Sequence, residues 1–193
     1  MKVGIYGGSF NPIHNGHIKL AEIFLKELEL EEVWFMVSPQ NPFKINNKLL
    51  NDTLRFQLVE KALKNKKYMI ACNYEFSLPK PSYTWNTLQQ LSSDFPANKF
   101  ILLIGGDNWL AFNKWYHAND ILENYSIAVY PRTCSKSTEN CNLFSTKNVT
   151  LLNIPLINIS STDIRQRIKK GETIKGLVPE CIVNDVKMFY SKI

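Results

Sequence analysis

Apolar residues follow two different periods along this chain, and these periods predict strands and helices in alternation. Residues 2–6 form a short apolar run that ends in glycines, which is typical of a buried strand. From residue 16 to residue 30, apolar side chains recur every three or four positions, which places them on one face of a helix. Further strands are predicted at 33–37, 69–74, 100–104, 126–130 and 149–153, and further helices at 52–63, 85–91, 162–169 and 179–189.

This alternation predicts the α/β class, with a mostly parallel sheet covered by helices on both faces. The chain has 193 residues, of which 45% are hydrophobic, and this fits one compact domain spanning 1–193. We find no internal repeat and no linker, and the polar segment 132–148 is expected to be an exposed connection. Ligands of such sheets bind beyond the carboxyl ends of the strands, so a site is expected in the turns there.

Composition narrows the class of protein only modestly. The formal net charge of +6 favours anionic partners such as nucleotides, phosphorylated metabolites or nucleic acid, without choosing among them. The first residues do not form a signal peptide and no apolar stretch reaches membrane-spanning length, so we expect a cytoplasmic protein with no membrane partner. The cysteines lack the density of a disulfide framework and the spacing of a zinc site, and are expected to be free thiols: Cys72, Cys134, Cys141 and Cys181.

The strongest functional signal is the turn after the first predicted strand, where residues 7–17 read GGSFNPIHNGH. Gly7 and Gly8 allow the backbone to pass close to a phosphate, and the helix start just beyond presents unpaired N–H groups with a favourable dipole. His14 and His17 lie one helical turn apart, so both imidazoles can face the same anion. The alternatives are a chance pair of histidines or two zinc ligands. Only three histidines occur in the chain and no third ligand lies nearby, which weakens both alternatives.

Two segments resemble the motifs of the nucleotidylyltransferase superfamily, whose members share a Rossmann-like fold and transfer a nucleotidyl group with Mg²⁺. The run SFNPxHxGH at 9–17 resembles the first motif, and ISSTDIR at 159–165 resembles the second. Read alone, the second segment is also a serine cap with an arginine one turn later, as many ordinary helices begin. The resemblance implies that both segments bind ATP, through Gly7, Gly8, Ser9, Phe10, Ser160, Ser161 and Thr162. It also implies that His14, His17 and Arg165 are the catalytic residues.

Within the superfamily, the closer resemblance is to the bacterial nicotinate-nucleotide adenylyltransferase family, and it covers nearly the whole chain. It rests on three more segments in the right order, which are PQNPFK at 39–44, SYTWNTL at 82–88 and GGDNW at 105–109. The resemblance implies that the backbone at Thr84 and Tyr116 holds the carboxylate of the nicotinate ring.

The same resemblance assigns roles to four other residues. Trp115 stacks on the pyridine ring, Lys44 contacts the substrate, and Gly105 and Asp107 lie at the nucleotide, with Asp107 facing the ribose or the metal-bound phosphates. The residues alone leave alternatives open. Trp115 shares helical spacing with two preceding aromatic residues, which is typical of a core. Asp107 can be a helix N-cap, and Lys44 can be an ordinary solvated lysine.

The resemblance implies adenylyl transfer from ATP to nicotinate mononucleotide, which gives nicotinate adenine dinucleotide and pyrophosphate in NAD biosynthesis. The expected partners are these two nucleotides and not nucleic acid, the expected cofactor is Mg²⁺ or another divalent cation, and a homo-oligomer stays open. No residue is assigned as a metal ligand. One rival is another superfamily member, such as pantetheine-phosphate adenylyltransferase or a cytidylyltransferase, which needs no carboxylate nest beside Trp115. The other is a non-catalytic nucleotide sensor or RNA-binding domain, which the intact histidine pair disfavours.

Overall fold

The structure, a computed structural model, describes residues 1–39, 49–130, 148–154 and 157–192. Its strands are β1 (Lys2–Gly8), β2 (Glu32–Val37), β3 (Met69–Cys72), β4 (Lys99–Gly105), β5 (Ser126–Tyr130) and β6 (Val149–Leu151). Its helices are α1 (Asn15–Glu27), α2 (Asp52–Leu63), α3 (Thr84–Asp94), α4 (Gly106–Leu110), α5 (Ala118–Asn124), α6 (Ser161–Lys169) and α7 (Val183–Tyr190).

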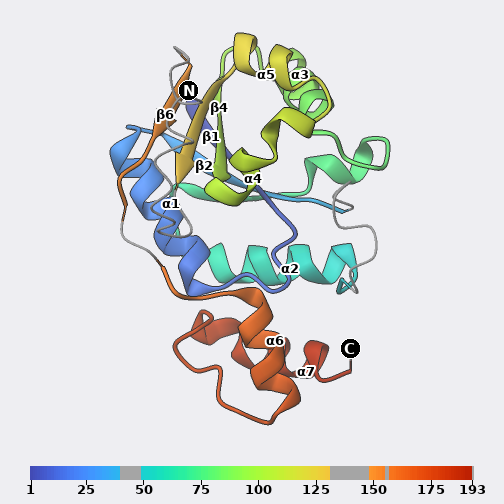
Figure 1. Ribbon diagram of the computed structural model, residues 1–193. Coiled ribbons are helices and arrows are strands. Elements are labelled where there is room, and N and C mark those ends of the chain that lie inside the picture. Colours follow the sequence, from blue (N-terminus) through green and yellow to red (C-terminus); the bar gives the residue numbers. More distant parts are fainter. Residues whose placement is uncertain (40–48, 131–147, 155–156, 193) are drawn as a thin grey trace.

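All neighbouring strands of the described sheet are parallel, in the order β3-β2-β1-β4-β5-β6 (Figure 1). This is the strand order of a doubly wound Rossmann-like sheet, so the predicted fold class is confirmed. The order reverses direction between β1 and β4, which lie side by side although β1 ends at Gly8 and β4 begins only at Lys99. Ligands of such sheets bind at this reversal, beyond the carboxyl ends of the strands.

Side chains along each strand point alternately to the two faces of the sheet, and each face has its own hydrophobic core. On β1, Val3 and Ile5 belong to one core and Tyr6 to the other. On β4, Leu102 and Leu103 divide in the same way. Because both faces are buried, the strands read as continuous apolar runs in the sequence.

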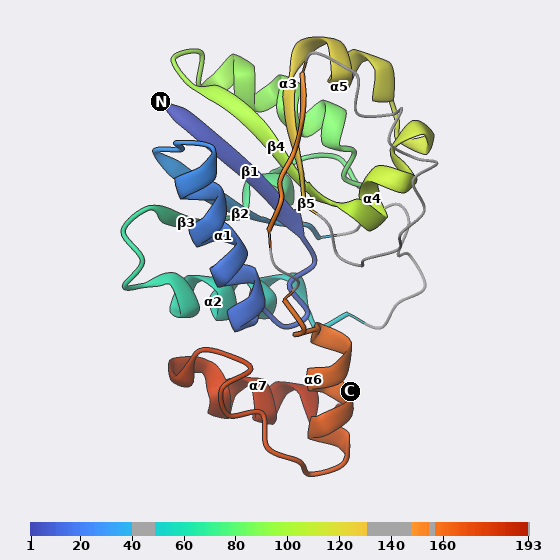
Figure 2. The same cartoon turned by 60° about the vertical axis from the view of Figure 1, so that its left-hand side comes forward.

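Helices α1 and α2 cover one face of the sheet, and α3, α4 and α5 cover the other (Figure 2). Phe24 of α1 and Leu58 of α2 are buried in the first core, whereas Leu88 of α3 and Ile121 of α5 are buried in the second. The C-terminal helices α6 and α7 lie beyond α2, and Val186 of α7 joins the core of α1 and α2 (Figure 1).

Several element boundaries differ from the sequence-based prediction. The third strand ends at Cys72, because Tyr74–Ser77 form a 3₁₀ turn instead of extending it. The last strand, β6, ends at Leu151, and α7 starts only after a 3₁₀ turn that follows Pro179. The sequence pattern does not predict α5, since a short helix with one buried residue shows no clear period.

The aromatic residues Trp109, Phe112 and Trp115 do not share one helix, although their spacing suggested it. Helix α4 ends at Leu110, and Phe112–Lys114 form a separate 3₁₀ turn. Trp109 and Phe112 are buried in the core of that face, whereas Trp115 is only partly buried against it.

Two further expectations concern the cysteines and the membrane. Cys72 and Cys181 are free thiols, as predicted. Cys134 and Cys141 lie outside the described residues, together with nearly all of the connection expected at 132–148. In the part of the chain that the structure describes, no helix has the length and apolar character needed to cross a membrane.

Candidate active site

The turn after β1 carries the first motif at the carboxyl edge of the sheet. Phe10 has a φ of 41°, which few residues other than glycine adopt, and its ring is buried. A Cβ at Gly8 would lie 3.1 Å from that ring, so the turn leaves little room for a side chain there. A Cβ at Gly7 would meet no heavy atom within 4 Å, because this residue borders a cavity. A side chain at Gly7 would therefore occupy space that a ligand can use.

His14 and His17 together form the start of α1. His14 is the N-cap, and its Nδ1 accepts a hydrogen bond from the backbone N–H of His17 at 3.3 Å. In return, Nδ1 of His17 accepts from the backbone N–H of His14 at 3.2 Å. The rings stack with their centroids 3.6 Å apart, and only 3% of His14 and 7% of His17 is exposed. This is a capping box in which two imidazoles replace the usual hydroxyl and carboxylate side chains.

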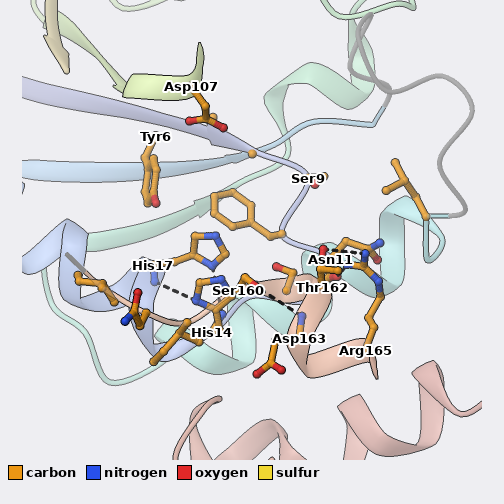
Figure 3. Close-up of a pocket in the computed structure, with 18 of the residues that line it drawn as sticks. Tyr6, Ser9, Asn11, His14, His17, Asp107, Ser160, Thr162, Asp163 and Arg165 are labelled. Atoms are coloured by element: carbon orange, nitrogen blue, oxygen red, sulfur yellow. Dashed lines mark hydrogen bonds between the residues drawn. The ribbon is translucent and has the colours of Figure 1, made fainter. Parts of the chain in front are cut away.

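The capping box also fixes which nitrogen of each neutral imidazole carries the proton. A ring nitrogen that accepts a hydrogen bond is unprotonated, so the proton of His14 and that of His17 are on Nε2. Both rings line the larger of two cavities at this edge of the sheet (Figure 3). The histidine pair therefore borders a space that an anion can occupy.

The second motif forms the start of α6, next to the same cavity. Ser160 is the N-cap, and its hydroxyl accepts from the backbone N–H of Asp163 at 3.1 Å. Ser160, Ser161 and Thr162 line the larger cavity (Figure 3). The first N–H groups of a helix have no partner inside the helix, and its dipole favours negative charge, so this helix start suits an anion.

Two side chains of α6 fasten the second motif to the first. The hydroxyl of Ser161 donates to the carbonyl of Pro12 at 2.9 Å. Nη1 of Arg165 donates to the carbonyl of Asn11 at 2.7 Å, and Nη2 donates to Oγ1 of Thr162 at 3.2 Å. Arg165 thus holds the first-motif backbone and is also one of the residues that line the cavity.

The larger cavity has a volume of about 990 Å³ and is bounded on its far side by residues from α4 and β5. Figure 3 shows Asp107 of α4 across the cavity from the two histidines. Asp107 is not a helix N-cap, since Gly105 occupies that position. A Cβ at Gly105 would lie 2.5 Å from Oδ1 of Asp107, so glycine leaves room for this carboxylate. Gly105 itself is not among the residues that line either cavity.

The larger cavity is lined by nearly all residues that were expected to bind ATP from the two motifs and the segment around Asp107. These residues are Gly7, Gly8, Ser9, Phe10, His14, His17, Asp107, Ser160, Ser161, Thr162 and Arg165.

A smaller cavity of about 420 Å³ lies between the ends of β1, β2 and β4 and the start of α3. Thr84, Trp115 and Tyr116 line it, as the resemblance implied for the acceptor. Among the described residues, no acceptor is found for the backbone N–H of Thr84 or of Tyr116, and both residues line this cavity. Trp115 lies 5.2 Å from Phe112 between ring centroids, so it both packs against the core and lines the cavity. The remaining wall is mainly apolar and includes Ile5, Met36, Leu88, Leu102, Leu103 and Ile104.

The two cavities adjoin at Gly7, Gly8 and Asn108, which line both of them. Gly7 and Gly8 lie at the end of β1 and Asn108 lies in α4, so the junction falls at the reversal of strand order. Two ligands that fill the cavities would therefore meet beside the glycine turn.

Three residues that line the cavities carry no clear signal in the sequence. Lys169 lies four residues after Arg165 on α6, and this helical spacing could have revealed it. Tyr190 of α7 reaches the first motif from the far end of the chain and donates to Oδ1 of Asn11 at 2.7 Å. Glu75 lines the smaller cavity with only 7% of its surface exposed.

Arg55 of α2 supports the first motif from behind. Its side chain is fully buried and donates to the carbonyls of Ser9 at 2.5 Å, Ser38 at 3.0 Å and Leu50 at 2.8 Å. It also pairs with Asp52 at 3.3 Å, so the buried charge has both an ion pair and hydrogen bonds. Arg55 therefore joins the turns after β1 and β2 to the start of α2.

Comparison with known proteins identifies the family that has this site. Residues 5–167 match the model of the cytidylyltransferase-like family. A protein of Cytophaga hutchinsonii named probable nicotinate-nucleotide adenylyltransferase is 46% identical over 178 residues, which cover 92% of this chain and 91% of that protein. A protein of the same name from Azobacteroides pseudotrichonymphae is 39% identical over 188 residues, which cover 96% of each. The chain belongs to the nicotinate-nucleotide adenylyltransferase family.

A solved structure agrees with the fold of this nicotinate-nucleotide adenylyltransferase family member. Plasmodium falciparum nicotinic acid mononucleotide adenylyltransferase complexed with NaAD superposes with a TM-score of 0.79 at 19% identity, over 97% of this chain and 98% of that chain. At this identity the likeness supports the fold alone. The family resemblance read from the motifs is confirmed, whereas the roles of individual residues stay predictions. Lys44 lies outside the described residues.

Proposed function

We propose that this chain transfers the adenylyl group of ATP to nicotinate mononucleotide and releases pyrophosphate and nicotinate adenine dinucleotide, as a step of NAD biosynthesis. The observation that carries the proposal is the junction of the two cavities at Gly7, Gly8 and Asn108. One cavity is lined by groups that suit phosphate anions, and the other is largely apolar with two backbone donors. Membership of the family supports the same assignment.

In this proposal each cavity takes one nucleotide. ATP occupies the larger cavity with its phosphates against His14, His17 and the start of α6. Nicotinate mononucleotide occupies the smaller cavity, with its carboxylate at the N–H groups of Thr84 and Tyr116 and its pyridine ring on Trp115. The phosphate of the mononucleotide then lies at the glycine turn, beside the α-phosphate of ATP.

The reaction needs no general base, because the attacking group is a phosphate that is already ionised at neutral pH. An oxygen of this phosphate forms a bond to the α-phosphorus of ATP, and the bond from that phosphorus to the bridging oxygen breaks. The bridging oxygen leaves with the electron pair as part of pyrophosphate. The protein therefore has to align two anions and to neutralise the charge on the oxygens of the transferred and leaving groups.

The side chains that line the larger cavity suit this task. The Nε2–H groups of His14 and His17 donate to oxygens of the α- and β-phosphates. The start of α6 and the guanidinium of Arg165 hold the β- and γ-phosphates. The bond from Arg165 to the carbonyl of Asn11 keeps these two groups of donors in a fixed relation.

A divalent cation with ATP also fits the residues of the larger cavity. Nucleotide-bound Mg²⁺ takes one or two protein carboxylates and completes its shell with phosphate oxygens and water. Asp107, which lines this cavity, would supply such a carboxylate. In the described segments, no three His, Cys, Asp or Glu side chains are grouped to bind a metal, so the phosphates would supply most ligands. When bound, the cation neutralises charge on the phosphate oxygens.

We also propose that residues 1–193 act as one domain. Val186 and Tyr190 of α7 share a hydrophobic core with Phe24 of α1 and Leu58 of α2, which supports one folding unit. A cytoplasmic location stays a prediction, and the oligomeric state stays open.

Pyrophosphate release from a panel of substrates tests the proposed function. The purified protein is assayed with Mg²⁺ and either ATP or CTP as donor, and with nicotinate mononucleotide, nicotinamide mononucleotide or phosphopantetheine as acceptor. We expect the highest kcat/KM for ATP with nicotinate mononucleotide. A higher kcat/KM for CTP or for phosphopantetheine would favour another member of the superfamily.

The acid should be a better acceptor than the amide. A carboxylate that accepts two N–H groups forms charge-assisted hydrogen bonds about twice as strong as neutral ones. An amide offers one oxygen and turns its NH₂ group towards a donor, which leaves polar groups unpaired. Sites of this kind can discriminate by roughly four to five powers of ten at best. A kcat/KM for nicotinamide mononucleotide equal to that for the acid would contradict the carboxylate nest at Thr84 and Tyr116.

A further inference from the structure

Glu75 is a buried carboxyl group in the smaller cavity, and neither the motifs nor the reaction assigns it a role. It lies in the 3₁₀ turn after β3, with 7% of its surface exposed. Burial raises the pKa of Glu75, while hydrogen bonds from neighbouring hydroxyls act in the opposite direction. Burial of a carboxyl group costs folding free energy unless the group is hydrogen-bonded or paired.

Both carboxyl oxygens of Glu75 are bound by hydroxyl groups from different elements. Oε2 accepts from Oγ of Ser38, directly after β2, at 2.8 Å, and Oε1 accepts from Oγ1 of Thr87, in α3, at 3.0 Å. Ser82 lies beside the same carboxyl, but its buried hydroxyl makes no hydrogen bond of good geometry with any described residue. Ser38, Glu75, Ser82 and Thr87 all line the smaller cavity.

This connection reaches the first turn of α3, where the acceptor carboxylate is proposed to bind. The backbone N–H of Thr87 donates to the carbonyl of Tyr83, the N-cap, and so closes the first turn of the helix. Oγ1 of Thr87 also lies 3.3 Å from that carbonyl. Thr84, whose N–H is one of the two proposed carboxylate donors, is the first residue of the same turn. A side chain that holds Thr87 therefore holds Thr84.

We infer that Glu75 is a positioning residue that fixes the start of α3 against the end of β2, and thereby sets the preference of the smaller cavity for an acid over an amide. The inference rests on the proposed function, because it concerns the nicotinate carboxylate. The inference gives Glu75 a role through α3, because its two oxygens accept from Ser38, directly after β2, and from Thr87 in α3.

The position of the donors matters more to the acid than to the amide. The charge-assisted hydrogen bonds to the acid depend on the position of the Thr84 N–H, whereas ring stacking on Trp115 contributes to the binding of both acceptors alike. A misplacement of about 1 Å can cost on the order of 100-fold in rate. Loss of the Glu75 connection should therefore reduce the selectivity ratio, which is kcat/KM for the acid divided by kcat/KM for the amide.

The test compares Glu75→Ala, Glu75→Gln and Thr87→Val with the wild type, and uses Ser92→Ala as the control. Ser92 is also in α3 and uses its hydroxyl to contact the carbonyl of Leu88, but it is not among the residues that line the smaller cavity. KM for ATP, KM for each mononucleotide, kcat and the urea midpoint of unfolding are measured for every variant.

We expect Glu75→Ala to raise KM for nicotinate mononucleotide by about tenfold or more and to lower the selectivity ratio by a similar factor. KM for ATP should stay within about twofold, because the larger cavity does not include Glu75. Glu75→Gln should recover most of the ratio, because an amide can accept from one hydroxyl and donate to the other. Thr87→Val should reproduce part of the loss, and Ser92→Ala should leave the ratio unchanged.

Two results would overturn the inference. One is an unchanged selectivity ratio in Glu75→Ala and Thr87→Val when the wild type prefers the acid. The other is a ratio that falls only together with a matching rise of KM for ATP, which would mark a general loss of structure. If Glu75→Ala does not fold, Thr87→Val and Glu75→Gln decide the same question. A wild type that does not use nicotinate mononucleotide would instead refute the proposed function.

Discussion

Replacing His17 by glutamine separates the catalytic role of this imidazole from its structural role. In the capping box, Nδ1 of His17 accepts the backbone N–H of His14, and a glutamine oxygen at the same helical position can do the same. The variant therefore keeps the helix start but loses the Nε2–H donor. His14→Asn is the matching change, because asparagine is among the best N-cap residues.

The two roles differ in the free energy that each variant should lose. Removal of one donor to the transition state costs roughly 100- to 1,000-fold in kcat, or about 2.7–4 kcal/mol. Loss of a cap costs about 0.5–2 kcal/mol of folding stability. We expect His17→Gln to lose roughly 100- to 1,000-fold in kcat, with a nearly unchanged free energy of unfolding. His17→Ala should show the same loss in kcat, and its free energy of unfolding should also fall by about 0.5–2 kcal/mol because the capping hydrogen bond is lost.

The assay is pyrophosphate release at saturating ATP and nicotinate mononucleotide, together with urea unfolding of each variant. A His17→Gln protein with kcat within about threefold of wild type would show that His17 only caps the helix if His17→Ala shows no catalytic loss either, since a glutamine NH₂ group can still donate to a phosphate and alanine cannot. In that case His17→Ala should lose activity only in proportion to its loss of folded protein, and the phosphate-binding assignment of His14 and His17 would fail.

Three further predictions follow from the cavities and from the pKa of Glu75. Arg165→Ala should raise KM for ATP more than KM for the acceptor. Lys169→Ala should have the same effect, but a weaker one that is seen only at low salt. Lys170→Ala is the control, because Lys170 is not among the residues that line the cavity. Unchanged ATP kinetics in both variants would remove α6 from the nucleotide site. Trp115→Ala should lower kcat/KM for both mononucleotides by a similar factor, and a loss confined to the acid would show that the indole does more than stack. Because burial raises the pKa of Glu75 above its ordinary value of 4.5, the folded protein binds this proton more tightly than the unfolded chain. Stability should therefore fall as pH rises from about 4.5 through the raised pKa, and Glu75→Gln should show a smaller fall in urea-derived stability over that interval.

The sequence predicts those parts of the site whose residues lie close together along the chain. His14 and His17 stand out because glycines, two imidazoles and a helix start occur within one turn. The order of strands and helices is likewise predictable, since each strand buried on both faces reads as an apolar run. The capping box adds what the pattern does not contain, namely that the two Nδ1 atoms accept backbone N–H groups.

Residues that reach the site through the tertiary fold could not be predicted in the same way. Glu75 follows a short edge strand and reads as an ordinary polar turn residue, and its partners Ser38 and Thr87 are 37 and 12 residues away. Tyr190 contacts Asn11 across 179 residues of sequence. Arg55 lies in helix α2, where an arginine is usually solvated, and only the fold shows that it is buried. Such long-range contacts leave no local period for a pattern to reveal.

The central claim, adenylyl transfer between two adjoining cavities, is tested most directly by following the phosphates of ATP. The wild-type protein is incubated with nicotinate mononucleotide, Mg²⁺ and ATP labelled either at the α-phosphate or at the γ-phosphate, and the dinucleotide product is separated from pyrophosphate. The account predicts that the α-label appears in nicotinate adenine dinucleotide and that the γ-label appears only in pyrophosphate. A γ-label on the mononucleotide, or no transfer of the α-label to it, would contradict the account.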